Sequence, residues 1–253
     1  MYDHLLSPLT LGRVTLPNRI CFLAHRTNFA RRGLLDDRHV AYYRRRAQGG
    51  CGLIIVGELS IHPNDRPWEA MIEAYRAEVV KDYKRLTAAV HEFETPIFAQ
   101  LNHHGFQSSG AISRHAIWGP SALSDIAFGE IAKPMEIEDM GVMVDAFAHA
   151  AVLAREGGFD GLEIDMGPES LLRQFLSPLS NLRQDEYGVL WKTGCACRWR
   201  SLMGSASPLE RTLQWEFVCV RMRSSGVQSP LMNQRSLPGN LRKPDKLTTS
   251  TVR

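Results

Sequence analysis

The segment from Gly158 to Gly188 most strongly constrains the fold, because it contains a short apolar strand that ends in a polar residue and is followed by a helical segment. Its first part, GLEID at 161–165, is an apolar run that ends in an acidic residue, as is typical of a buried parallel strand. Residues 171–176 (LLRQFL) then repeat apolar side chains at helical spacing. Barrels and doubly wound sheets bind ligands where such strands end, so Asp165 lies at the edge where a site is expected.

Strands and helices alternate through the preceding sequence. Apolar runs predict further strands at 18–24, 53–57 and 97–101, and helical periods predict helices at 37–48, 77–93 and 138–155. Residues 5–17 indicate a hairpin, and the aperiodic connection 102–136 is long enough to suggest a functional loop. Parallel strands with helical crossovers are thus expected, giving an α/β fold. Four strands and three full helices are the first four units of a (β/α)8 TIM barrel.

The same segment carries a long motif. Residues 175–179 (FLSPL), Asn181, Arg183 and residues 185–188 (DEYG) match, in order, the sequence VEIHGAHGYLLDQFLSPLTNRRTDEYGG. Many members of the Old Yellow Enzyme family read close to this, including the 2,4-dienoyl-CoA reductase and trimethylamine dehydrogenase-like branch. The chain therefore resembles this family of NADH:flavin oxidoreductases over residues 1–188. The resemblance implies a TIM barrel that binds FMN. The flavin would take hydride from NADH or NADPH and pass it to an activated alkene, or it would take hydride from an amine substrate instead.

The resemblance also implies the site residues. It places Ala24, His25, Arg26, Thr27, Gly57, Glu58 and Gln100 at the flavin, and it makes His103 and Asp165 the catalytic candidates. Glu58 departs from the small residue usual at its position, whereas the Gln100 amide can both donate to and accept from a flavin edge. His103 is favoured over His104 by its distance in sequence from Gln100, as in the family pattern QLxHxG.

Each of these residues also has a purely structural interpretation. A glycine that ends a strand, such as Gly57, is usually a turn residue. A glutamine at a strand end is more often a satisfied polar group, and adjacent histidines are ordinary in loops. The two histidines have no cysteine or carboxylate partners at metal-ligand spacing, so no metal site is predicted.

Asp165 marks a departure from the family. Many members place a His–His or His–Asn pair where this chain has Asp165 and Pro168, and Ser170 replaces a frequent tyrosine proton donor. A carboxylate only accepts hydrogen bonds and cannot stabilise an oxyanion. Asp165 is therefore expected to face a cationic or amine substrate, or else to bind neighbouring backbone N–H groups.

The sequence changes character after Gly188. Residues 1–188 hold 19 Lys and Arg against 24 acidic residues, whereas residues 189–253 hold 11 against three. A basic, aromatic-bearing tail could bind nucleic acid. Codons allowed for residues 189–207, read one base earlier, can instead encode GSVENRMRLPLEVLDGVRLA, which is similar to the family's continuation. Residues 189–253 are therefore interpreted as an out-of-frame tail, irregular or disordered, that follows the N-terminal half of an FMN barrel at 1–188.

Several expectations about the whole protein follow. Five cysteines without metal spacing and no membrane-length apolar run indicate a cytoplasmic chain with small-molecule substrates and no nucleic-acid or membrane partner, although it could form oligomers. An iron–sulfur cluster and FAD are expected only in a missing C-terminal part. Half a barrel would leave its fourth strand unpaired, so weak or absent FMN binding and poor solubility are predicted. A truncated, non-catalytic product is the alternative function, and Cys21 is expected to be a packed thiol.

Overall fold

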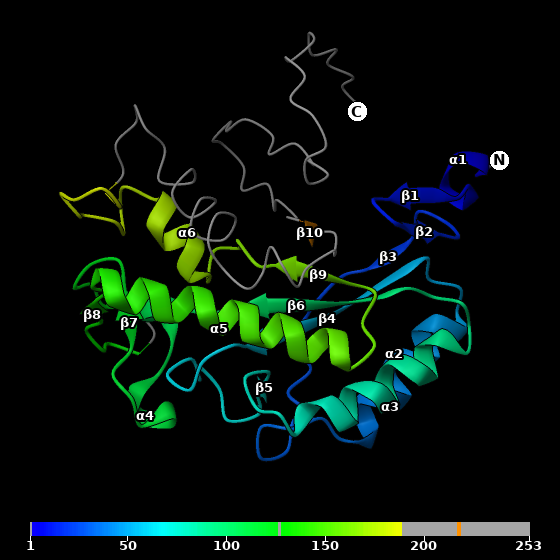
Figure 1. Cartoon of the computed structure of the whole chain (residues 1–253), viewed down its shortest axis with the longest axis horizontal. Helices are drawn as coiled ribbons and strands as arrows, with labels where there is room; N and C mark the ends of the chain where they lie inside the picture. Colours follow the sequence, from blue (N-terminus) through cyan, green and yellow to red (C-terminus); the bar gives the residue numbers. More distant parts are fainter. Residues whose placement is uncertain (1, 126–127, 189–216, 219–253) are drawn as a thin grey trace, which may run out of the picture.

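A parallel sheet forms the centre of this computed structural model, which describes residues 2–125, 128–188 and 217–218 (Figure 1). Its strand order is β10-β9-β6-β4-β3, with β5 paired to β4. The strands are β3 (Cys21–Phe22), β4 (Leu53–Ser60), β5 (Ile72–Glu73), β6 (Ile97–Asn102), β9 (Gly161–Ile164) and β10 (Phe217–Val218). Every pair in this sheet is parallel, so the carboxyl ends of the strands share one edge.

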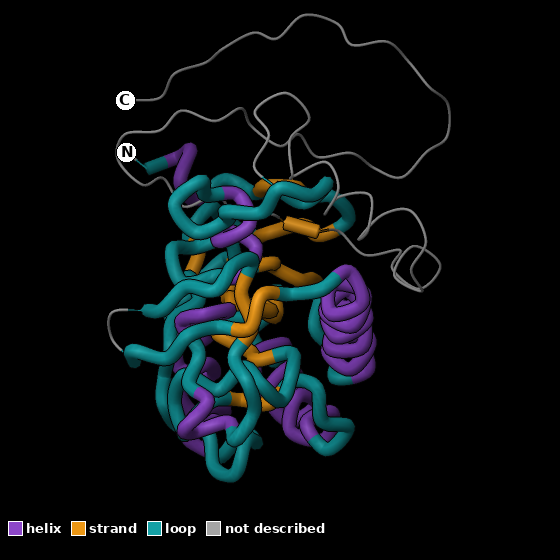
Figure 2. The backbone as a smooth tube through the Cα atoms, turned by 90° about the vertical axis from the view of Figure 1, so that its left-hand side faces the viewer, coloured by secondary structure: helices purple, strands orange, loops and turns teal. Residues whose placement is uncertain are grey.

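Three long helices cross over between the strands. They are α2 (Asp37–Gln48), α3 (Val79–His91) and α5 (Ile137–Glu156), and α3 packs against both α2 and α5. Figure 2 shows helices outside the strands. The start of α2 follows from its sequence, because the Asp36 carboxylate accepts from the Arg38 N–H at 2.8 Å. Gly50, with φ of 85°, follows its end.

The core divides along the alternation of the strands. Ile54 and Val56 belong to the large cluster under the helices, together with Tyr83 and Phe147. Leu53 and Ile55, which alternate with them on β4, form a second cluster on the other face with Leu16 of the amino-terminal hairpin and Phe98 of β6. The hairpin of β1 (Leu9–Leu11) and β2 (Val14–Leu16) packs on this second cluster, so it covers the amino-terminal end of the sheet interior.

The family motif at 175–188 has a structural role. Arg183 donates to the carbonyl oxygens of Pro120 and Met135 and pairs with Asp185, and Asn181 donates to Phe175 and Tyr187 at 2.8 and 2.7 Å. The two carbonyl contacts of Arg183 hold the long loop, which contains η1 (Gly105–Gln107), α4 (Gly110–Ser113), β7 (Trp118–Gly119) and β8 (Lys133–Pro134). There are two further short helices. One is α1 (Asp3–Leu6), ahead of β1, and the other is α6 (Leu171–Leu176), after β9.

Three expectations differ from the structure. The strand predicted at 18–24 is only Cys21–Phe22. The backbone before it binds the segment that leads into β4, because the Ile20 carbonyl accepts hydrogen bonds from the N–H groups of Gly52 and Leu53. Cys21 is exposed rather than packed. The fourth strand, β9, is not left unpaired, since Leu162 and Glu163 stand in register with Phe217 and Val218 of β10. The remainder of the predicted out-of-frame tail lies outside the described residues.

Candidate active site

The predicted flavin residues meet near the carboxyl ends of β3, β4 and β6. The strand predicted to end at Gly57 continues to Ser60, so Gly57 and Glu58 lie inside β4. His25 forms an isolated antiparallel bridge with Gly57, which brings the segment after β3 against β4. Gly57 has no room for a side chain, because a Cβ there would overlap the Gln100 side chain and press on the Ala24 Cβ. Ala24, Gly57 and Gln100 therefore converge on one point. The glycine thus makes room for the Gln100 amide against β4, and this amide is the group that could meet the edge of a flavin.

Gln100 is held by a residue that sequence analysis did not select. Its Nε2 donates to Oε1 of Glu163 on β9 at 2.6 Å. Both side chains are buried, at 7% and 4% exposure. Burial raises the pKa of Glu163 to about 7, and the nearby Asp165 charge adds to this against the opposing hydrogen bond from Gln100. This carboxyl thus titrates near neutrality.

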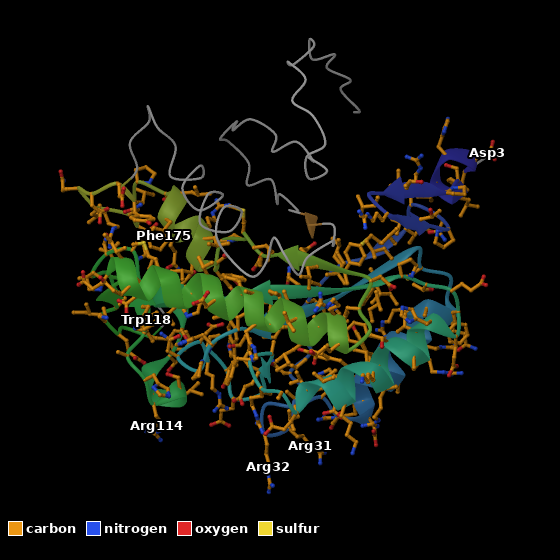
Figure 3. The ribbon with its side chains drawn as sticks, viewed as in Figure 1. Asp3, Arg31, Arg32, Arg114, Trp118 and Phe175 are labelled. Carbon is orange, nitrogen blue, oxygen red and sulfur yellow. The ribbon has the colours of Figure 1, made fainter. Side chains whose placement is uncertain are left out.

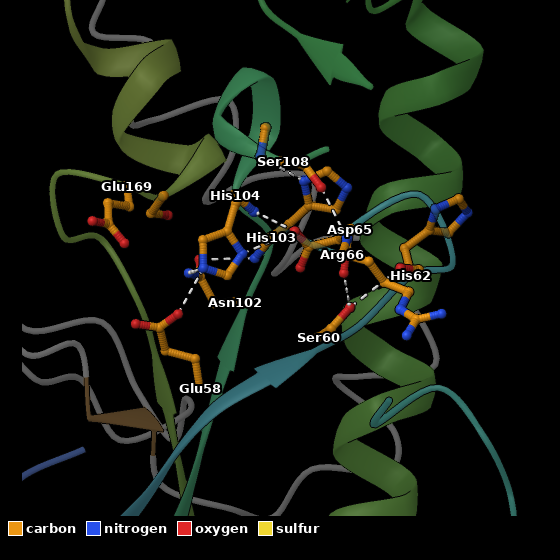
Figure 4. A network of polar contacts seen from close by, with 12 residues as sticks. Glu58, Ser60, His62, Asp65, Arg66, Asn102, His103, His104, Ser108 and Glu169 are labelled. Atoms are coloured by element: carbon orange, nitrogen blue, oxygen red, sulfur yellow. Dashed lines mark hydrogen bonds and ion pairs between the residues drawn. The ribbon is translucent and has the colours of Figure 1, made fainter. Parts of the chain in front are cut away.

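A buried charged group is centred on His104, as Figure 4 shows. His104 is fully buried, with Nδ1 2.9 Å from Asp65 Oδ1 and Nε2 2.6 Å from Glu58 Oε2. Burial alone would lower the pKa of His104, but Asp65 and Glu58 outweigh it and raise that pKa to about 10. The imidazolium in turn keeps the pKa of Glu58 and of Asp65 low against the effect of burial. His104 is therefore a fixed positive charge at neutral pH.

Arg26 supplies a second positive charge. Its Nη2 lies 3.0 Å from Glu169 Oε2 and 3.7 Å from Glu58 Oε1, and its guanidinium stacks on Trp68 at 3.0 Å from the ring centroid. Its Nε is buried and has no hydrogen-bond partner within the described part of the chain. Arg26 was expected to approach the flavin mainly through its backbone. In the structure, its side chain contacts Glu58, Trp68 and Glu169, which lie in three different segments of the chain.

His103, the predicted catalytic histidine, is engaged on both ring nitrogens. Its Nδ1 accepts from the Gly105 N–H at 2.9 Å, which leaves Nε2 to donate to Asn64 Oδ1 at 2.8 Å. Burial lowers its pKa to about 4, so the ring is neutral. A catalytic role for His103 stays a prediction, and the histidine that reaches the carboxylates is His104.

Thr27 is paired with a buried histidine. Its Oγ1 lies 3.2 Å from Nε2 of His39, whose Nδ1 accepts from the Asp36 N–H at 3.1 Å. Burial lowers the pKa of His39, so the ring is neutral and its proton is on Nε2. Thr27 must then accept from His39, which leaves its own hydroxyl proton free to be donated.

Asp165 binds a neighbouring backbone N–H group, which was one of the two alternatives expected for it. Its Oδ1 accepts from the Gly167 N–H at 2.8 Å, and its carbonyl accepts from Ser170 Oγ at 2.7 Å. Burial nevertheless raises its pKa, and the charges of Glu58 and Glu169 add to this effect. Asp165 thus belongs to a group of four carboxylates and two cations, the site charge group (Glu58, Asp65, Asp165, Glu169, Arg26 and His104).

Three of these residues could also be considered as metal ligands. Glu58, His104 and Glu169 each offer one ligand atom, and all three atoms lie within 4.8 Å of one another. The His104 Nε2 already meets Glu58, however, and the Arg26 guanidinium contacts both carboxylates. Arg26 and His104 thus already supply positive charge to these carboxylates.

Sequence analysis missed Asn64, Asp65, Glu163 and Glu169. Glu163 was hidden in the middle of an apolar strand, where its partner depends on the register of β6 against β9. Asp65 lies in the loop after β4, and no local pattern connects it to His104. One available signal was the acidic residue inside an otherwise apolar strand, since a buried charge requires a partner.

Comparison with known proteins identifies the family. The model of the NADH:flavin oxidoreductase / NADH oxidase family matches residues 4–199. The chain belongs to this family. The match ends 11 residues beyond Gly188, inside the predicted out-of-frame tail.

Relatives include NADPH dehydrogenase of Bacillus subtilis, 36% identical over 193 residues that make up 74% of this chain and 55% of the relative. N,N-dimethylglycine/sarcosine dehydrogenase of Chromohalobacter salexigens is 31% identical over 191 residues, covering 74% of this chain and 28% of the relative. The chain thus spans about half or less of these proteins.

Solved structures of the family have the same fold. The Old Yellow Enzyme homologue of Zymomonas mobilis is 27% identical, with a TM-score of 0.72 over 79% of this chain and 58% of that one. A 2-naphthoyl-CoA reductase superposes with a TM-score of 0.75 at 22% identity. These similarities confirm the predicted α/β class with a parallel sheet. Within the residues that the structure describes, no helix is both long and apolar enough to cross a membrane.

Proposed function

We propose that residues 1–188 are the first half of an FMN-dependent NAD(P)H oxidoreductase barrel whose substrate is a cationic amine. The site charge group carries this proposal, because four carboxylates face only two cations in a largely buried place. An excess of negative charge favours a cationic ligand and disfavours a developing oxyanion. The sequence similarity to a dehydrogenase of N-methylated amines supports the same choice.

The residues present fit FMN. The Gln100 amide, which packs on Gly57, and the free proton of the Thr27 hydroxyl offer the acceptor and the donor that the edge of a flavin ring requires. FMN would supply hydride transfer. The chain's own residues would position it, and Asp165 and Glu58 would hold the ammonium group of the substrate by charge.

The test uses the purified chain, titrated with FMN and then with dimethylamine or a cyclic enone while the flavin absorbance is recorded. We expect dimethylamine to perturb the bound flavin and the enone to leave it unchanged. Asp165→Asn should weaken the amine effect roughly tenfold or more, because a hydrogen bond to a charged group is lost. Asp145→Asn, on the exposed face of α5, is the control. A response to the enone alone would refute the amine proposal.

A second candidate is a truncated product without catalysis. The observation that favours it is the change from an acidic to a basic sequence after Gly188. Flavin retention separates the two candidates. A chain that retains no FMN after gel filtration would support the truncated product.

A further inference from the structure

Glu163 and Gln100 are adjacent on neighbouring parallel strands. They are register partners of β9 and β6, so their side chains project to the same side of the sheet. Nε2 of Gln100 donates to Oε1 of Glu163 at 2.6 Å, the length of a charge-assisted bond. Each side chain is more than nine-tenths buried.

The second oxygen of Glu163 makes no such contact. Its Oε2 is buried and has no hydrogen-bond partner among the residues that the structure describes. Asp165, on the same segment, raises the pKa of Glu163, and Glu163 in turn raises the pKa of the Cys21 thiol on β3. Neither of these two neighbours is a cation. The only described partner of the carboxyl is thus the Gln100 amide, and a buried carboxyl with a single partner is costly to keep.

This contact determines which end of the Gln100 amide faces the site. The ionised form of Glu163 accepts hydrogen bonds only, so in that form it must meet the NH2 end of Gln100, whereas the protonated form could also donate. The carbonyl end, Oε1, is then turned toward Gly57, where a Cβ would overlap it. Without Glu163, the amide could rotate and present either end.

We infer that Glu163 is a positioning residue that fixes which end of the Gln100 amide faces away from β9, so that a flavin bound beside this amide meets a hydrogen-bond acceptor. The inference rests on the proposed function. The pyrimidine edge of an oxidised flavin carries one N–H donor, N3, and an acceptor fixed in this direction selects for that donor. Glu163 itself would not touch the flavin.

The first experiment compares FMN with 3-methyl-FMN, which lacks the N3 proton, by fluorescence titration of the chain. We expect the chain to prefer FMN by roughly tenfold, as the loss of one hydrogen bond predicts. Glu163→Gln, which can donate to or accept from either end of the amide, should reduce this preference toward unity. Glu156→Gln, at the exposed end of α5, should keep it. An unchanged preference in Glu163→Gln would overturn the inference.

A second measurement needs no flavin, so it separates failure of this inference from failure of the proposed function. The side-chain amide resonance of Gln100, assigned by its loss in Gln100→Leu, should shift with pH as Glu163 titrates, with a midpoint above the usual range of a glutamate because the carboxyl is buried. The shift should vanish in Glu163→Gln. A Gln100 resonance that does not respond to pH in the parent chain would overturn the inference, whether or not FMN binds.

Discussion

At the residue scale, His104 depends on both of its carboxylate partners. It is fully buried between Asp65 and Glu58, and Asp65 is fully buried too. Removing one member of a buried ion pair leaves an uncompensated charge, which costs about 3–5 kcal/mol. Exposed pairs contribute only about 0–1 kcal/mol. The Arg44–Glu92 pair, with side chains 46% and 55% exposed, is of the second kind.

We therefore expect Asp65→Asn to lower the free energy of unfolding by about 3 kcal/mol, measured by urea denaturation. Glu92→Gln should change it by less than about 1 kcal/mol. Equal effects of the two substitutions would show that the buried group does not stabilise the fold.

The same variant should alter the pH dependence of stability. The pKa of His104 is raised from 6.5 to about 10, so its contribution is complete below pH 6.5 and is lost as the pH rises through about 10. Urea midpoints at pH 6.5 and 9.5 should therefore differ in the parent chain. The difference should shrink in Asp65→Asn, because the folded-state pKa of His104 falls toward its unfolded value.

At the residue scale, the sequence located segments that the structure brings together, but it did not show which side chains pair with each other. Arg26, Glu58 and Gln100 could be placed because each follows or ends an apolar run. Their contacts could not, because Gln100 meets Glu163 across 63 positions and His104 meets Asp65 across 39. Such contacts depend on strand register and loop path, which no local pattern encodes.

At the element scale, α5 joins β9 through a glycine that lies against the aromatic core. Gly157 caps α5, and a Cβ there would overlap the Cβ and ring of Tyr83, a fully buried side chain. Tyr83 also packs edge-on against Phe159 at 5.1 Å. The overlap involves atoms close to the backbone of α3, which cannot move without shifting that helix. Close packing at this point thus fixes α5 against α3.

We expect Gly157→Ala to reduce the free energy of unfolding by about 1–3 kcal/mol, as overpacking of a filled core does. Gly141→Ala is a matched control in the same helix, because a Cβ there meets nothing within 4 Å. It should raise stability by up to about 1 kcal/mol, since alanine favours the helix. Urea unfolding measures both, and a destabilised Gly141→Ala with an unaffected Gly157→Ala would contradict this packing.

The predicted elements were most accurate where the chain carries its own boundaries. The helix predicted at 37–48 is found as Asp37–Gln48, because Asp36 and the glycines at 49–50 mark both ends. The connection 102–136 could not be resolved into η1, α4, β7 and β8. Residues distant in sequence hold this connection in place, among them Arg183, whose side chain donates to two carbonyl oxygens of the connection. Two residues of the connection, Arg114 and Trp118, are labelled in Figure 3.

At the scale of the whole molecule, the described sheet has the order and direction of part of a barrel. β9 is joined by β10 over only two residues, whereas β4 and β6 share a longer register. In a complete barrel, the phosphate of a bound cofactor is often held by the loops after strands seven and eight. The described residues do not include such strands. Weak FMN binding by this chain remains our prediction.

The last prediction concerns the reading frame. The acidic sequence through Gly188 and the basic sequence after it differ as two reading frames of one gene would, so we expect a missing or extra base near the codons for residues 187–191. Sequencing the DNA across these codons measures this directly. A gene repaired at that base should encode the remaining barrel strands, and its product should bind FMN at least roughly a hundredfold more tightly, because a closed site adds several flavin contacts of about 1 kcal/mol each. If the frame is intact as written, residues 189–253 are the true continuation. FMN titration of the chain with and without them would then show whether they take the place of the other half of the barrel.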